Sequence, residues 1–132
     1  VGNFRGRKGQ QDMKPVIEKT AFGSIVINGK EYRHDIAIGL NGEVRKRRKK
    51  LSKEKYGTSH KISREEAEDV YEPHAERLII GSGKFDRVCL SEGAKKFFHG
   101  VGCQVELHPT GKAAKVWNRA EGKVLALFHI TC

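Results

Sequence analysis

A glycine–serine–glycine sequence forms the first candidate ligand site of this chain. Gly81, Ser82 and Gly83 follow a short apolar run that predicts a buried strand, and α/β domains bind ligands in the loops at the carboxyl ends of such strands. Backbone amides in such a loop can hold an anion such as phosphate or a carboxylate. The motif lacks the third glycine and the directly following helix of a dinucleotide-binding loop, so we do not expect a dinucleotide. The alternative is that the glycines serve only a tight turn.

The second candidate site is the sequence GTSHK. It places two hydroxyls, an imidazole and an ammonium in one loop, at Thr58, Ser59, His60 and Lys61. Such a set can bind or activate an anionic ligand, because an imidazole changes its charge near neutral pH. Ser59 and His60 are adjacent in sequence, which does not favour a nucleophile–base pair. The alternative is that they serve as turn and capping groups.

The third candidate site is the pair His129-x-x-Cys132. Strand alternation predicts that His129 and Thr131 share one face and that Cys132 lies on the other. A zinc site needs about four ligands in recognisable pairs, and this is a single weak pair, so we expect no metal and no cofactor. The dipeptide His34-Asp35 resembles that of metal-dependent phosphohydrolases but lacks their further ligands, and we interpret it as a hydrogen-bonding pair on a sheet face. We therefore predict a ligand-binding set and no catalytic residues; the set is Gly81, Ser82, Gly83, Thr58, Ser59, His60, Lys61 and His129.

Most of the positive charge lies in one segment. The chain has a formal net charge of +10, and residues 45–61 hold nine basic residues against one acid, Glu54. A chain that is basic in only one segment is not a histone-like or ribosomal-type protein. Tyr56 is the only aromatic residue of the segment, so a base-stacking platform for nucleic acid is absent. We interpret the run as a rim for a protein partner and keep electrostatic nucleic-acid binding through residues 45–61 as an alternative; the rim is Arg45, Lys46, Arg47, Arg48, Lys49 and Lys50.

The first part of the chain predicts a β-meander. Residues 22–28 and 30–38 are two strand-like runs on either side of Asn28-Gly29, a dipeptide favoured in two-residue hairpin turns. A second turn of the same chemistry at residues 40–43 leads into Val44. Residues 45–61 show no clean period.

The second part predicts helices alternating with strands. Ser63 begins a capping box with Glu66, and an apolar stripe at helical spacing runs from Ala67 to Leu78. Ser91 and Thr110 cap two further helices, and buried strands cover residues 77–81, 103–107 and 124–130. This order predicts a parallel or mixed sheet covered by helices. With the front hairpin it gives a three-layer α/β fold.

The chain length of 132 residues fits one domain. Residues 1–12 have no periodicity and three glycines, and Met13 is the only methionine. We predict that the natural chain starts at Met13 and forms one domain over residues 13–132, preceded by a leader from expression or a disordered tail. Three cysteines without CxxC spacing, no secretory signal and no run near the ~20 apolar residues of a membrane span predict reduced thiols and a cytoplasmic location.

Several separated motifs resemble one known family. FGSIVINGKEYRHDIAI, RLIIGSGKF, HPTGKAAKVWN and ALFHITC are similar to the adipogenesis-associated domain family, whose members include a mitochondrial respiratory complex I assembly factor; GTSHK and the final HITC resemble the archaeal branch. The resemblance spans roughly residues 20–132. It implies a three-layer fold with a hairpin beside a mixed sheet, roles in assembly or signalling, and no catalytic set.

Three functions follow from these patterns. The first is a non-enzymatic protein-binding or assembly module with a crevice and a basic rim. The second is a small enzyme or ligand-binding domain for an anionic molecule, and the third is electrostatic nucleic-acid binding. Convergence of Gly81–Gly83, His60 and His129 on one pocket would favour the second.

Overall fold

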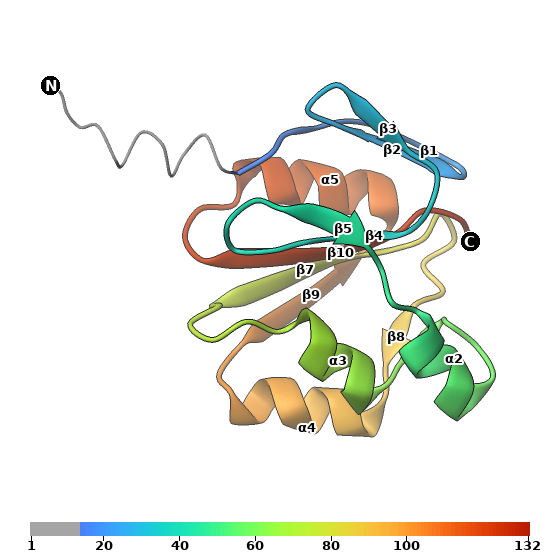
Figure 1. Ribbon diagram of the computed structural model, residues 1–132, viewed down its shortest axis with the longest axis vertical. Helices are drawn as coiled ribbons and strands as arrows, with labels where there is room; N and C mark the ends of the chain where they lie inside the picture. Colours follow the sequence, from blue (N-terminus) through green and yellow to red (C-terminus); the bar gives the residue numbers. More distant parts are fainter. Residues whose placement is uncertain (1–13) are drawn as a thin grey trace, which may run out of the picture.

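The computed structural model describes residues 14–132 (Figure 1). The predicted leader, residues 1–12, and the predicted start at Met13 lie outside the described residues. The strands are β1 (Ile17–Ala21), β2 (Ser24–Ile27), β3 (Lys30–Tyr32), β4 (Ile36–Ile38), β5 (Val44–Lys46), β6 (Lys61–Ile62), β7 (Arg77–Ser82), β8 (Cys89–Leu90), β9 (Gln104–His108) and β10 (Val124–His129). The helices are α2 (Lys50–Tyr56), α3 (Arg64–Val70), α4 (Glu92–Gly100) and α5 (Thr110–Arg119).

The front of the chain forms the predicted antiparallel hairpin, with one strand more. β2 and β3 pair around Asn28-Gly29, where both residues have positive φ, 48° and 80°, as a type I′ turn requires. β1 pairs with β2 on the other side and completes a three-stranded sheet. The predicted strand over residues 30–38 is wrong as one element, because the chain leaves this sheet after Tyr32 and β4 joins the central sheet.

The central sheet is mixed, as predicted, with the order β5-β4-β10-β7-β9. β10 pairs in parallel with β7 and antiparallel with β4, and all six of its residues are buried. A strand that is covered on both faces must be apolar throughout, which explains the unbroken run in its sequence.

Two apolar cores, one on each face of this sheet, make the fold a three-layer α/β domain (Figure 1). On one face, Ile79 and Phe128 pack with Trp117 of α5 and Ile25 of β2. On the other face, the sheet packs against α3 and α4 through residues such as Ala67 and Phe98. The sheet therefore fixes where each strand ends and which loops meet at its edge.

The helix after Ser63 is shorter than predicted. α3 ends at Val70, because Pro73 has no amide hydrogen and disfavours helical backbone in the residue before it. Ser63 caps the helix by accepting from the Glu66 amide at 3.0 Å, as predicted. The return bond of the capping box is absent, since the Ser63 amide donates to Ser52 Oγ at 2.9 Å.

Two further elements differ from the sequence prediction. α2 arises within the basic segment, which has no apolar period, and only Ser52 of this helix is buried. The predicted cap of α5 is wrong, because Pro109 holds the N-cap position and Thr110 makes no capping bond. Among the described residues, no helix is long and apolar enough to cross a membrane.

Candidate functional site

Two imidazoles and a thiol meet at the end of β10. His60, His129 and Cys132 each place a potential ligand atom within 4.8 Å of those of the other two. Nε2 of His60 lies 3.7 Å from Sγ of Cys132, and the rings of His60 and His129 stand edge to face with centroids 5.2 Å apart. We call these three residues the Cys–His site.

Strand pairing brings these distant segments together. His129 lies opposite Ser82 in the parallel pair β7–β10, so Gly83 follows directly beside the end of β10. The loop after β7 leads to β8, where the Cys89 amide donates to the His60 carbonyl at 2.8 Å. The sequence left open whether Gly83, His60 and His129 converge, and the structure places the three residues next to one another.

Cys132 lies on the same side as His129, which corrects the prediction from strand alternation. β10 ends at His129, and the residues beyond it do not follow the two-residue period of a strand. Thr131 Oγ1 lies 3.2 Å from Nε2 of His129, and Cys132 reaches His60. Alternation holds only while the chain is extended in a sheet.

Gly83 leaves room for this turn of the chain. Its φ is +96°, and a Cβ there would lie 2.5 Å from the carbonyl carbon and oxygen of Cys132 and 2.9 Å from Cδ2 of His129. Both the left-handed backbone and the close contact require glycine. The glycine therefore acts through its missing side chain.

The glycine loop is poorly suited to an anion. The Gly83 amide donates to Oγ1 of Thr110 at 2.9 Å, and the Lys84 amide donates to the Thr131 carbonyl at 2.7 Å. Ser82 Oγ donates to the His108 carbonyl at 3.0 Å and contacts Asp86. A Cβ on Gly81 would lie 2.7 Å from the ring of Phe128. These bonds and contacts support the structural alternative for the loop.

Asp35 orients His129 from inside the protein. Nδ1 of His129 lies 2.8 Å from Oδ2 of Asp35, and Oδ1 accepts from the Ile130 amide at 3.0 Å. Burial opposes ionisation of this carboxyl, but the hydrogen bond and charge of His129, the Ile130 amide and Arg47 outweigh it and lower the pKa of Asp35. The ionised carboxylate accepts a hydrogen bond from Nδ1–H of His129, and Nε2, on the other side of the ring, contacts the hydroxyl of Thr131.

Arg47 is buried and links the segment before His60 to the carboxylate behind His129. Its predicted place on an exposed basic rim is therefore wrong. The residue is 3% exposed. Its guanidinium donates to Asp35 Oδ2 at 2.9 Å, to both Glu66 oxygens at 2.6 and 3.0 Å and to the Ser59 carbonyl at 2.7 Å. One side chain thus fixes the carboxylate behind His129 and the backbone before His60. Ser52 Oγ completes the network by donating to Glu66.

The surroundings of His60 favour the neutral form of its imidazole. Burial and then the charges of His129, Arg87 and Arg47 lower the pKa of its imidazole. Its amide donates to Oγ1 of Thr58 at 3.1 Å, so Thr58 serves the turn, as its structural alternative predicts. Lys61 places its ammonium over the ring of Tyr56, 4.8 Å from the centroid.

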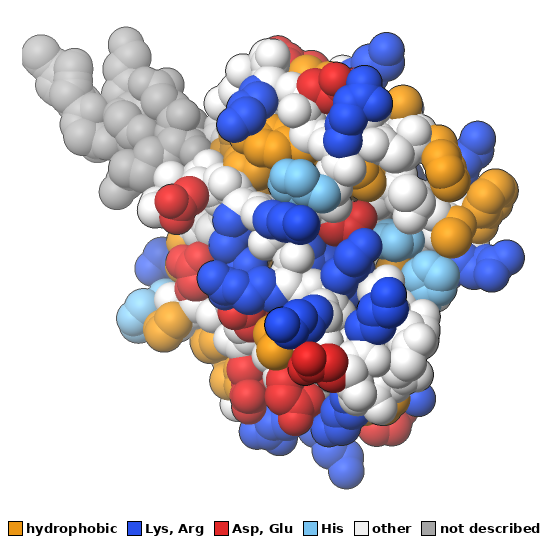
Figure 2. Space-filling view, turned by 45° about the vertical axis from the view of Figure 1, so that its right-hand side comes forward, with side chains coloured by type: hydrophobic (Ala, Val, Ile, Leu, Met, Phe, Trp, Pro, Cys, Tyr) orange, Lys and Arg blue, Asp and Glu red, His pale blue; other side chains and the backbone are white. Residues whose placement is uncertain are grey.

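The predicted basic rim is interrupted by acids. Arg45 and Arg48 both pair with Asp69, at 2.9 and 2.5 Å. Figure 2 shows basic and acidic side chains interspersed on one face of the molecule. Within residues 14–132, the rim residues that form no ion pair are Lys46, Lys49 and Lys50, all exposed.

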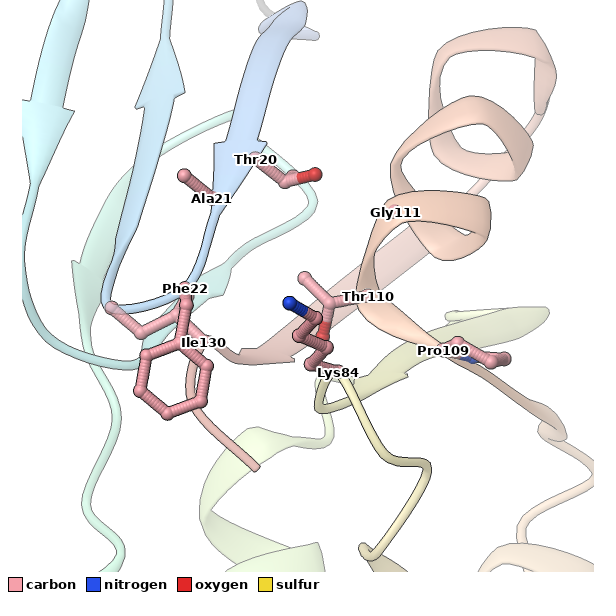
Figure 3. A pocket seen from close by; sticks show the side chains of 8 residues that line it. All are labelled: Thr20, Ala21, Phe22, Lys84, Pro109, Thr110, Gly111 and Ile130. Carbon is pink, nitrogen blue, oxygen red and sulfur yellow. The ribbon is translucent and has the colours of Figure 1, made fainter.

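An open hollow of about 270 Å³ lies between the β1–β2 turn and the start of α5 (Figure 3). Phe22, Ile130 and Pro109 give it an apolar lining, and Lys84 lies beside Thr110 within it. Phe22 is 58% exposed. The hollow is distinct from the Cys–His site.

The Cys–His site offers two imidazole nitrogens and one thiol to a common point. These donors suit a ligand that accepts electron pairs, such as a transition-metal ion. From the sequence, Asp35 is interpreted as half of a hydrogen-bonding pair with His34, and Glu66 as part of a capping box. Their support of the site together with a buried Arg47 is not predicted. The position of Asp35 directly before the apolar run of β4 was a signal, but its meaning depends on β4 lying next to β10.

The chain matches one protein family over most of its length. The family model described as "Protein of unknown function (DUF498/DUF598)" covers residues 17–129. No curated protein shows significant similarity. Several solved structures are significantly similar to this chain.

The conserved hypothetical protein PH1505 from Pyrococcus horikoshii OT3 is 36% identical, over 88% of this chain and 98% of that one, with a TM-score of 0.82. The protein MT938 is 34% identical, over 90% and 100%, with a TM-score of 0.77. A Bordetella parapertussis protein shares the fold at 21% identity over 89% and 96%, with a TM-score of 0.69. The chain therefore belongs to the DUF498/DUF598 family of proteins of unknown function.

Proposed function

We propose that the protein is a small ligand-binding domain that works through the Cys–His site. The observation that carries this proposal is the convergence of His60, His129 and Cys132 within 4.8 Å. A buried ionic network behind the site adds support. Burying Arg47, Asp35 and Glu66 costs more free energy than an apolar packing of the same volume usually would, so a role in orienting His129 and His60 gives a reason for its presence.

Native mass spectrometry of the full chain, isolated under reducing conditions, tests this proposal. We expect a bound mass on the wild-type protein that disappears in Cys132→Ser. Cys89→Ser is the matched control, because Cys89 is exposed and its thiol is not part of the three-residue cluster. A bound mass that persists in Cys132→Ser, or none under any isolation condition, would refute the proposal.

A protein-binding or assembly role is the second candidate function. The observation that favours it is the apolar hollow with Phe22 exposed and Lys84 in its lining, which includes no acidic residue. This composition suits a partner segment that carries an apolar side chain next to a carboxylate. The resemblance to the adipogenesis-associated domain family, which has assembly factors and archaeal members, supports this second candidate. We include a cytoplasmic location in the same proposal.

Crosslinking from position 22 tests the second candidate. A photoreactive amino acid at Phe22 should capture one defined partner in cells, and Lys84→Glu should abolish that capture. The same amino acid at Val101, which is 36% exposed on another part of the surface, is the control. Equal capture from both positions would argue against the hollow.

Electrostatic nucleic-acid binding through residues 45–61 has less support. Arg47 is buried, and Arg45 and Arg48 are engaged with Asp69. Binding through the remaining lysines predicts an affinity for generic DNA or RNA that falls steeply between ~50 and ~200 mM salt. Unchanged fluorescence anisotropy of a labelled oligonucleotide at low salt would eliminate this function.

A further inference from the structure

The spacing of the three donor atoms matches the edges of a metal coordination sphere. Zinc binds histidine nitrogen at about 2.0–2.1 Å and cysteine sulfur at about 2.3 Å with tetrahedral angles, so bound nitrogen and sulfur lie about 3.6 Å apart. Nε2 of His60 and Sγ of Cys132 are 3.7 Å apart. All three ligand atoms lie within 4.8 Å of one another. Side-chain rotations that move these atoms by about an ångström would bring all three to bonding distance of one ion.

We infer that the ligand of the Cys–His site is a divalent transition-metal ion of the zinc class, bound by Nε2 of His60, Nε2 of His129 and Sγ of Cys132. This inference rests on the function proposed above and names the ligand. Binding replaces the S–H bond of Cys132 by a sulfur–metal bond and releases one proton to water.

The residues behind His129 form the support that metal-binding histidines have in known sites. Such a histidine almost always donates its second ring N–H to a carboxylate or a carbonyl, which fixes the tautomer and the ring orientation. Asp35 has this role through Nδ1 of His129 at 2.8 Å, and Arg47 fixes Asp35 in turn. The other ring nitrogen, Nε2, contacts the hydroxyl of Thr131 at 3.2 Å. A bound ion would replace this contact.

The geometry of the site favours metal binding over acyl-transfer chemistry. Nε2 of His60 faces Sγ of Cys132 at 3.7 Å, and a ligand atom of His129 lies within 4.8 Å of both. The Gly83 and Lys84 amides, which lie beside Cys132, are already engaged, so they are not free to stabilise an oxyanion as acyl transfer would require.

The donor set also selects among ions. Magnesium and calcium require oxygen ligands, and the carboxylate that contacts the site, Asp35, is committed to Arg47, His129 and the Ile130 amide. Thiolate and imidazole suit zinc, cobalt and nickel. Three protein ligands leave a fourth tetrahedral position for water or an external ligand, as in catalytic rather than structural zinc sites.

Cobalt(II) titration of the full chain, freed of metal and kept reduced, tests this inference. We expect one cobalt per chain, strong visible bands of a tetrahedral ion, and an ultraviolet thiolate-to-cobalt band; zinc should remove all of them and magnesium none. Cys132→Ser should abolish the thiolate band and weaken binding at least tenfold, whereas Cys89→Ser should leave both unchanged. Asp35→Asn keeps all three ligands and should weaken binding about 10- to 100-fold.

X-ray absorption of the zinc-loaded wild-type protein is a readout that does not depend on any variant folding. One sulfur and two imidazoles per zinc support the inference. A first shell of oxygen only, or no tight cobalt binding by the wild-type chain, overturns it. If an organic mass that depends on Cys132 is then found by native mass spectrometry, the proposed ligand-binding function stands without the metal; if neither is found, both fail.

Discussion

The Cys–His site and the surface around it use the same residue types in opposite ways. Arg47 and Arg48 are neighbours in one basic run, yet the Arg47 side chain is 1% exposed and donates to four acceptor atoms, whereas the Arg48 side chain is 61% exposed and pairs with Asp69. Gly83 is tightly enclosed, and Gly100 has nothing within 4 Å of the position of a Cβ. The comparison teaches that position in the fold, not residue type, sets the energetic role.

Substitution of Arg47 should produce the largest effect. Arg47→Met keeps much of the side-chain volume but leaves Asp35 and Glu66 buried without their cation, and breaking a buried ion pair in this way costs about 3–5 kcal/mol. Urea unfolding followed by circular dichroism measures the loss. If the free energy of unfolding falls by less than about 1 kcal/mol, the range of exposed ion pairs, the contrast between Arg47 and Arg48 is contradicted.

Substitution of Gly83 should have the next largest effect. Gly83→Ala forces a side chain onto a backbone with φ +96° and against the Cys132 carbonyl, and such strain costs about 1–3 kcal/mol. Gly100→Ala is the matched control. It lies at the end of α4 with open space around it, where alanine is expected to stabilise by up to about 1 kcal/mol. Equal shifts of the thermal midpoint in both variants would contradict the role of Gly83.

Substitution of Arg48 should have the smallest effect. Asp69 also pairs with Arg45, at 2.9 Å, and should keep this partner when Arg48 is replaced; exposed pairs contribute about 0–1 kcal/mol. Arg48→Met should therefore change the free energy of unfolding by less than about 1 kcal/mol, and the small difference should shrink further at high salt. The same urea titration at low and high salt checks this, and a loss similar to that of Arg47→Met would refute it.

Much of the fold could be predicted because local chemistry decides it. Asn28-Gly29 specifies a hairpin turn, Ser63 and Ser91 cap helices, and the apolar run of β10 requires a strand covered on both faces. The errors arise where local and global requirements compete. Pro73 ends α3 within an apolar stripe of helical period, and Thr110 gives up its capping bond to contact Gly83 and the His129 carbonyl.

The candidate site could be predicted only in part. His60, His129 and the glycine loop were recognisable by residue type, and their convergence follows from the pairing of β7 with β10 and of β6 with β8. Asp35 lies 94 positions from His129 in the chain, and no periodicity relates them. Arg47 was indistinguishable in sequence from the five other basic residues of its run.

The sequence by itself determined the turns, most of the helix starts, the buried strands and the three-layer class, because these depend on backbone preferences and apolar spacing within a few residues. The tertiary structure alone decided that Cys132 faces His60, that Asp35 supports His129 and that Arg47 lies inside. Such contacts depend on strand order and on which side chain fills a given space, and these are properties of the packed chain as a whole.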